Sequence, residues 1–139
     1  MRISLNFSTV EWASLPDEVR SEINQYMISA MNIFDHFLEL KNVKVRRLKV
    51  FSLSLIPPKE FDNIFQFGDF RSSCQCNVTF DLFNYFKQEP SEGERIKKLL
   101  TIVRDSFVKI CIHNQLDYSS FDLAYKLAIE EVEKFKEID

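Results

Sequence analysis

Hydrophobic and polar residues alternate along three segments of the chain, and this period of two predicts β-strands. The segments are residues 2–8, residues 43–56 and residues 72–82, of which the last alternates most regularly. Within residues 43–56 the apolar positions change parity, so we expect a β-bulge near residues 47–50. The Pro57-Pro58 pair then ends that strand, because proline cannot donate a hydrogen bond to a sheet.

Apolar residues spaced three and four apart predict three long amphipathic helices. We expect the first to run from near Ser14 to about Leu40, the second over about 92–113 and the third over about 120–137. Each follows a residue suited to capping a helix N-terminus, namely Ser14, Ser91 and Ser119. Residues 59–70 fit neither period; their pattern allows a short helix over 59–66 followed by a turn at Gly68.

These elements follow the order β-α-β-β-α-α and predict a single α+β domain over residues 1–139. We expect a three- or four-stranded, mainly antiparallel sheet with helices packed on one face. The opposite face is then either an ordinary solvated face or a flat hydrogen-bonding surface for a partner. Its predicted residues are mostly short hydroxyls and amides: Arg2, Ser4, Asn6, Ser8, Ser52, Ser54, Gln75, Asn77, Thr79 and Asp81.

Seven of the 14 phenylalanines fall within residues 61–86. The alternation assigns Phe80 to the core, whereas the rings of residues 61–70 follow no period and stand among acids. Aromatic anchors surrounded by charges are typical of protein-binding hot spots, although a buried hairpin with its loop has the same composition. The residues predicted to bind a partner are Glu60, Phe61, Asp62, Phe65, Phe67, Asp69, Phe70 and Asp81.

Composition narrows the function classes. A net charge of −3 and an apolar fraction of 45% are ordinary for a soluble globular domain. The odd number of cysteines, with no signal sequence, predicts reduced thiols and a cytoplasmic location. Residues 41–49 carry five bases and no acid, a composition that suits phosphate binding in a nucleic-acid-binding adaptor. The same bases would also complement the acidic first helix.

No residues have the spacing of a catalytic or metal-binding set. Cys74 and Cys76 would need Cys111 and a distant histidine to complete a four-ligand zinc site, so we expect no metal and no cofactor. Two glycines are too few for a phosphate-binding glycine-rich loop, and we expect no enzyme. The alternative is a small-ligand-binding or enzymatic domain with a pocket between helices and sheet. Its polar groups would be Asp81, Tyr85 and either His36 or His113.

The whole chain resembles the small single-domain immunity proteins of bacterial polymorphic-toxin and contact-dependent growth-inhibition systems. The resemblance rests on size, mild acidity, abundant phenylalanine, scarce glycine, the α+β order and the lack of a catalytic set. It implies a cytoplasmic protein that binds a cognate toxin domain, often a nuclease, and blocks its active site. Toxic nuclease domains are often basic because their substrates are polyanions, so acids of this chain would steer such a toxin and aromatic rings would anchor it. The steering residues are then Glu60, Asp62, Asp69 and Asp81, and the anchors Phe61, Phe65, Phe67 and Phe70.

Overall fold

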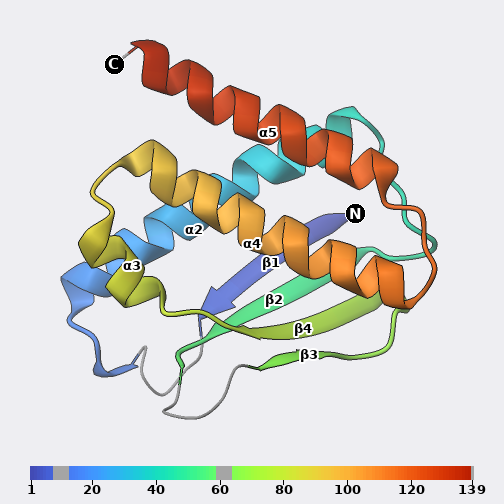
Figure 1. The fold of residues 1–139 in the computed structure, drawn as a ribbon, viewed down its shortest axis with the longest axis horizontal. Coiled ribbons are helices and arrows are strands. Elements are labelled where there is room, and N and C mark those ends of the chain that lie inside the picture. The colour runs from blue at the N-terminus through green and yellow to red at the C-terminus, as the bar shows by residue number, and fades with distance from the viewer. Residues whose placement is uncertain (8–12, 59–63, 139) are drawn as a thin grey trace.

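The computed structural model describes residues 1–7, 13–58 and 64–138, the last four of these by their backbone alone. The described strands and helices follow the order β-α-β-β-β-α-α-α (Figure 1). The strands are β1 (Arg2–Phe7), β2 (Val50–Ile56), β3 (Phe65–Phe67) and β4 (Ser73–Thr79). The helices are α2 (Asp17–Leu40), α3 (Leu82–Gln88), α4 (Glu92–His113) and α5 (Ser119–Ile138).

The four strands form one mixed sheet in the order β1-β2-β4-β3. β1 is parallel to β2 and β2 is parallel to β4, whereas β3 and β4 are antiparallel. The α+β class and the four strands confirm the prediction, but the expected mainly antiparallel sheet is wrong. Parallel neighbours need a long crossover connection, and α2 provides one between β1 and β2. The stretch of chain that contains β3 provides the other, between β2 and β4.

Two local predictions are also corrected. Residues 43–49 lie in a turn and the strand begins only at Val50. The change of parity near residues 47–50 therefore marks the boundary between turn and strand, and the predicted β-bulge is wrong. The helix allowed over 59–66 is absent from residues 64–66, where β3 begins at Phe65, while residues 59–63 lie outside the described residues. The strand predicted over 72–82 ends at Thr79, and helix α3, which was not predicted, begins at Leu82.

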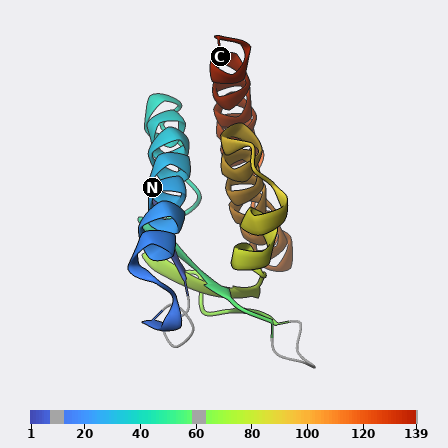
Figure 2. The ribbon, with the colours of Figure 1, turned by 90° about the vertical axis from the view of Figure 1, so that its left-hand side faces the viewer.

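The helices cover one face of the sheet, as predicted, and leave the other face open (Figure 2). α2 and α4 lie next to the sheet, and α5 packs against both of them on the far side (Figure 1). Fully buried Phe107 of α4 joins these layers, because its ring centroid lies 5.1 Å from that of Phe51 in β2 and 4.1 Å from that of Phe121 in α5. None of the described helices is long and apolar enough to cross a membrane.

Candidate binding surfaces

The aromatic residues predicted to anchor a partner lie along β3 and the loop after it. Phe65, Phe67 and Phe70 are half-buried and pack against the core. The Phe67 ring lies edge-on to His113 at 5.1 Å, and the Phe70 ring lies 6.3 Å from Phe107. Because Lys109 also lies over the Phe65 ring, each of the three rings contacts α4 on one side. Three further predicted residues, Glu60, Phe61 and Asp62, lie outside the described residues.

The predicted acids do not form one patch with these rings. Asp69 is exposed and forms an ion pair with Arg71 at 3.1 Å. Asp81 lies at the other end of β4, where its carboxylate accepts a hydrogen bond from the Asn84 backbone N–H at 3.1 Å and caps α3. A strand of the length of β4 spans about 20 Å. The two acids therefore lie at opposite ends of the sheet.

The open face of the sheet carries uncharged polar side chains in register. Strand pairing places Ser4, Ser52 and Gln75 in one row. The next row contains Asn6, Ser54, Asn77 and Gln66, one from each strand. Within this face the Gln75 amide donates to Ser54 Oγ at 3.2 Å and to Asn77 Oδ1 at 3.4 Å.

Most of the residues predicted for this face are confirmed by the strand pairing. Thr79 ends the β4 edge, where its hydroxyl accepts a hydrogen bond from the Ile64 backbone N–H at 2.7 Å. Asp81 is an exception, because it follows the strand and caps α3. Ser8 lies outside the described residues. Arg2, at one end of β1, carries the only charged side chain among the described residues whose register places them on this face.

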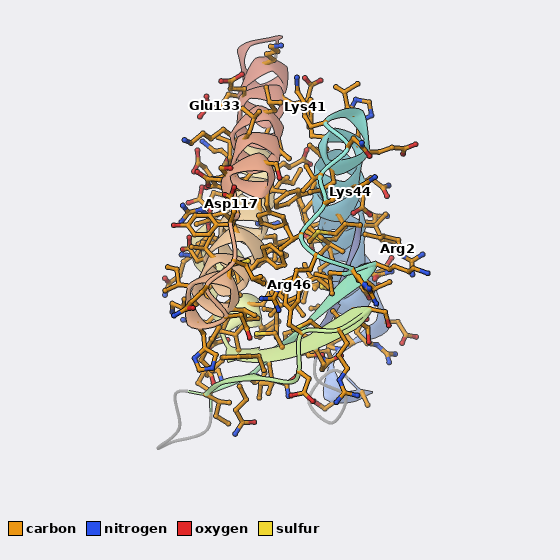
Figure 3. All side chains as sticks on the ribbon, turned by 90° about the vertical axis from the view of Figure 1, so that its right-hand side faces the viewer. Arg2, Lys41, Lys44, Arg46, Asp117 and Glu133 are labelled. Atoms are coloured by element: carbon orange, nitrogen blue, oxygen red, sulfur yellow. The ribbon has the colours of Figure 1, made fainter. Side chains whose placement is uncertain are left out.

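A second polar surface lies where the parallel strands begin. The turn over 41–49 presents its bases to solvent, while Val43, Val45 and Leu48 between them are buried. No described residue forms an ion pair with any of the five bases. The expected complement between this segment and the acidic first helix is therefore not seen. Figure 3 looks onto this end of the molecule and labels Lys41, Lys44, Arg46 and Arg2.

Two hollows border this turn. The larger, of about 580 Å³, is lined by Arg46, Arg47, Phe70, Arg71 and Ser72. The smaller, of about 420 Å³, lies beside Arg2 and two lysines of the turn, and Asp35 and Glu39 also line it. The sequence pattern identifies residues 41–49 as basic but does not predict that Arg71 and Ser72 lie beside them. These two residues are brought there by the pairing of β2 with β4.

Asp35 of α2 has a structural role at the sheet edge that the sequence pattern does not reveal. Its carboxylate accepts a hydrogen bond from the Ile3 backbone N–H of edge strand β1 at 3.0 Å. Burial raises the pKa of Asp35, although this hydrogen bond and the positive charges of Arg2 and the N-terminus partly oppose the rise. An aspartate next to an apolar helix stripe gives no sequence signal of such a contact.

The thiols lie outside any arrangement suited to nucleophilic chemistry. All three cysteines are free and buried, and burial raises the pKa of Cys76 and of Cys111 to about 12. At neutral pH these thiols are protonated, whereas the nucleophile and metal ligand is the thiolate. Within the described residues, no three histidine, cysteine or acidic side chains are grouped to hold a metal ion.

The polar groups predicted for a small-ligand pocket do not converge. Asp81 borders a small hollow of about 220 Å³ with Phe7 and Phe83. The Tyr85 hydroxyl instead donates to the Glu94 carbonyl oxygen at 3.3 Å. The two histidines lie on different helices, and neither lines that hollow.

The fold and these surfaces define an α+β domain with a half-covered, mostly parallel sheet, an open face on which Arg2 is the only charged residue among those described, and a basic end. Comparison of the chain with protein-family models, curated proteins and solved structures finds no match. The open face and the basic end are therefore the features that bear on function.

Proposed function

We propose that this chain is a protein-binding module, and specifically an immunity protein that neutralises a cognate toxin domain by direct binding. The observation that supports this proposal best is the open sheet face, which has almost no charge in a chain of which 28% is charged. Cores of protein–protein interfaces are depleted in charged residues in the same way. Ordered amide and hydroxyl groups add specificity, because a partner that leaves them unpaired loses affinity.

The dimensions of this face suit the centre of an interface. β1, β2 and β4 are each about 20 Å long and the three-residue β3 is about 10 Å long, so at a spacing of about 4.8 Å the four strands present roughly 340 Å². A stable complex buries about 800 Å² on each partner, so the bordering surface must contribute the rest. We place β3 and its flanking loop, with Phe65, Phe67, Asp69 and Phe70, in that border. Asp81 borders the opposite end of the face.

The net charge of −3 fits the kind of partner proposed. A nuclease toxin is basic because its substrate is a polyanion, and an acidic inhibitor gains association rate from the opposite charge. Asp81 is exposed at one end of the sheet, where it extends this attraction beyond the centre of the face, whereas Asp69, also exposed, is paired with Arg71 at the basic end.

The test is neutralisation and direct binding of the toxin domain encoded by the neighbouring open reading frame. Production of this chain should restore growth of cells that make the toxin domain. Calorimetry should then show that Ser54→Arg, which places a long cation in the centre of the open face, weakens binding at least tenfold, or about 1.4 kcal/mol.

Ser29→Arg is the matched control, because it makes the same change at an exposed position of α2. This variant should bind like the parent chain. Failure of the parent chain to bind or neutralise the toxin domain would refute the function. Parent-like binding by Ser54→Arg would instead refute the assignment to the sheet face.

A further inference from the structure

The basic turn is held in place by its apolar residues. Val43, Val45 and Leu48 are 2%, 3% and 5% exposed, so the backbone is anchored on both sides of Arg46. The Leu48 N–H donates to the Val45 carbonyl at 3.2 Å, and the Lys49 N–H donates to the Ser72 carbonyl at 2.8 Å. The backbone that carries these cations is therefore ordered before any ligand arrives, which lowers the backbone part of the ordering cost of binding.

Arg46 has an unfavourable backbone conformation, because its φ of 51° is left-handed. That region costs a residue with a side chain about 1–2 kcal/mol. The other two such described residues, Asn42 and Gln115, each follow the C-terminus of a helix, where the left-handed conformation completes the helix cap. Arg46 is instead the first central residue of the turn closed by the hydrogen bond from the Leu48 N–H to the Val45 carbonyl, a position that glycine would fill without strain. Backbone strain of this kind clusters at binding sites.

The cations of the turn also differ from other arginines of the domain. Arg95 pairs with Glu22 and Arg104 pairs with Asp122, each at 2.9 Å. Arg46 and Arg47 pair with no described acid, and they line the hollow of about 580 Å³. This volume lies within the roughly 300–1,000 Å³ of small-molecule sites.

The lining of this hollow combines guanidinium groups with an aromatic ring. Arg71 adds a third guanidinium, although it already pairs with Asp69 at 3.1 Å. The Phe70 ring lies against Phe107 in the core and also lines the hollow, so its position is fixed. Guanidinium forks match the oxygens of phosphate, and a fixed aromatic ring offers a surface on which a nucleobase stacks.

From this juxtaposition we propose that the hollow binds a nucleotide unit, with its phosphate on Arg46 and Arg47 and its base against Phe70. This activity goes beyond toxin binding by the centre of the sheet face, although Phe70 borders both surfaces. Two sources share the chemistry: a free mononucleotide and a single-stranded nucleic acid. A strand would continue from this hollow past Lys44 and Lys49 into the neighbouring one.

The experiment measures fluorescence anisotropy of a labelled, 5′-phosphorylated ten-nucleotide thymidine strand with the full chain at low salt, about 50 mM. AMP and a ten-residue glutamate peptide serve as competitors. The Arg46→Gln/Arg47→Gln double variant should weaken strand or AMP binding at least tenfold. The control Lys87→Gln/Lys126→Gln removes the same charge from exposed positions on α3 and α5 and should bind like the parent chain.

Arg46→Gly separates binding from folding. It removes the guanidinium and the left-handed strain together, so its melting temperature should equal or exceed that of the parent chain while its affinity falls. Inorganic phosphate serves as a third, weaker competitor. Phe70→Leu should weaken the binding of the strand and of AMP but leave the inhibition constant of phosphate unchanged. If Phe70→Leu lost affinity for AMP and for inorganic phosphate alike, stacking of the base on Phe70 would be contradicted.

The competitors decide between the sources. Full displacement of the strand by AMP indicates a mononucleotide site. A single-stranded site is indicated if AMP does not displace the strand and the affinity depends on salt. The logarithm of the association constant should then fall with the logarithm of the salt concentration, with a slope of about 0.7 for each phosphate contacted. The proposal is overturned if neither nucleotide binds, if the control loses as much affinity as the arginine double variant, or if the glutamate peptide competes as well as AMP.

Discussion

Replacing Asp35 by alanine and by asparagine separates the hydrogen bond of this carboxylate from its charge. Arg2 donates its backbone N–H to Lys49 beside β2, so the next N–H along β1, that of Ile3, points away from the sheet. Asp35 accepts that hydrogen bond at 3.0 Å. Alanine removes the acceptor, whereas asparagine keeps an oxygen in the same place without the negative charge.

The expected magnitudes follow from the environment of the bond. A hydrogen bond to a charged group contributes about 1.5–3 kcal/mol. Ile3 is only 3% exposed, so water replaces the lost acceptor poorly. We expect Asp35→Ala to lower the free energy of unfolding by about that amount. Asp35→Asn should match or exceed the parent chain at pH 7, because burial, the largest influence on the pKa of this carboxyl, disfavours its charged form.

The stability that Asp35 contributes should change with pH in one direction. The pKa of Asp35 is raised above its ordinary value of 3.8. The folded chain therefore binds more protons than the unfolded chain between these two values. The contribution of Asp35 to stability falls as pH rises through that window, and asparagine has no such titration.

Urea unfolding of the three proteins, followed by circular dichroism from mildly acidic to neutral pH, tests both expectations. The free energy of the parent chain minus that of Asp35→Asn should fall as pH rises from about 4 and then become constant. A difference that rises with pH, or an asparagine variant as unstable as the alanine variant, would refute this account of Asp35.

Three further predictions concern stability and thiol chemistry. Phe107 is fully buried between sheet and helices, so Phe107→Ala should lower the free energy of unfolding in urea titrations by about 3–5 kcal/mol; an unchanged midpoint would contradict its central position. Gln115 has a left-handed φ of 56°. Gln115→Gly should raise the melting temperature, because relief of that strain outweighs the added freedom of the unfolded chain by roughly 0.5–1 kcal/mol. A lower melting temperature would show that the glutamine side chain stabilises the α4 cap. A thiol reagent at pH 8 should modify none of the three buried cysteines in the folded protein and all three in urea. Rapid reaction of the reagent with Cys76 or Cys111 in the folded protein would contradict their burial.

Periodicity predicted the elements that bury one regular face. β2 buries every second residue, and α4 buries residues spaced three and four apart, so burial itself produces the pattern. β3 is too short for a period to be visible, with only three residues. The sequence pattern of residues 43–49 resembles that of a strand, because a turn whose valines are buried also alternates between apolar and polar positions.

The candidate surfaces were predictable to different degrees. The uncharged face follows from strand alternation alone, and the strand pairing confirms most of its members. Burial of the aromatic rings of 65–70 was not predictable, since it depends on where α4 crosses the sheet. The contact of Phe70 with Phe107 joins residues that no local pattern relates.

The direction of the strands explains why the basic end exists at all. β1, β2 and β4 are parallel, so the residues that precede or open each strand gather at one edge of the sheet. Arg2, Lys49 and Arg71 come together for this reason. Had β4 been antiparallel to β2, as the sequence led us to expect, Arg71 and Phe70 would lie about 20 Å away, at the other end of the strand. The hollow would then lack its aromatic ring and its third guanidinium. The topology that the sequence pattern could not specify is therefore the feature that assembles the proposed nucleotide site.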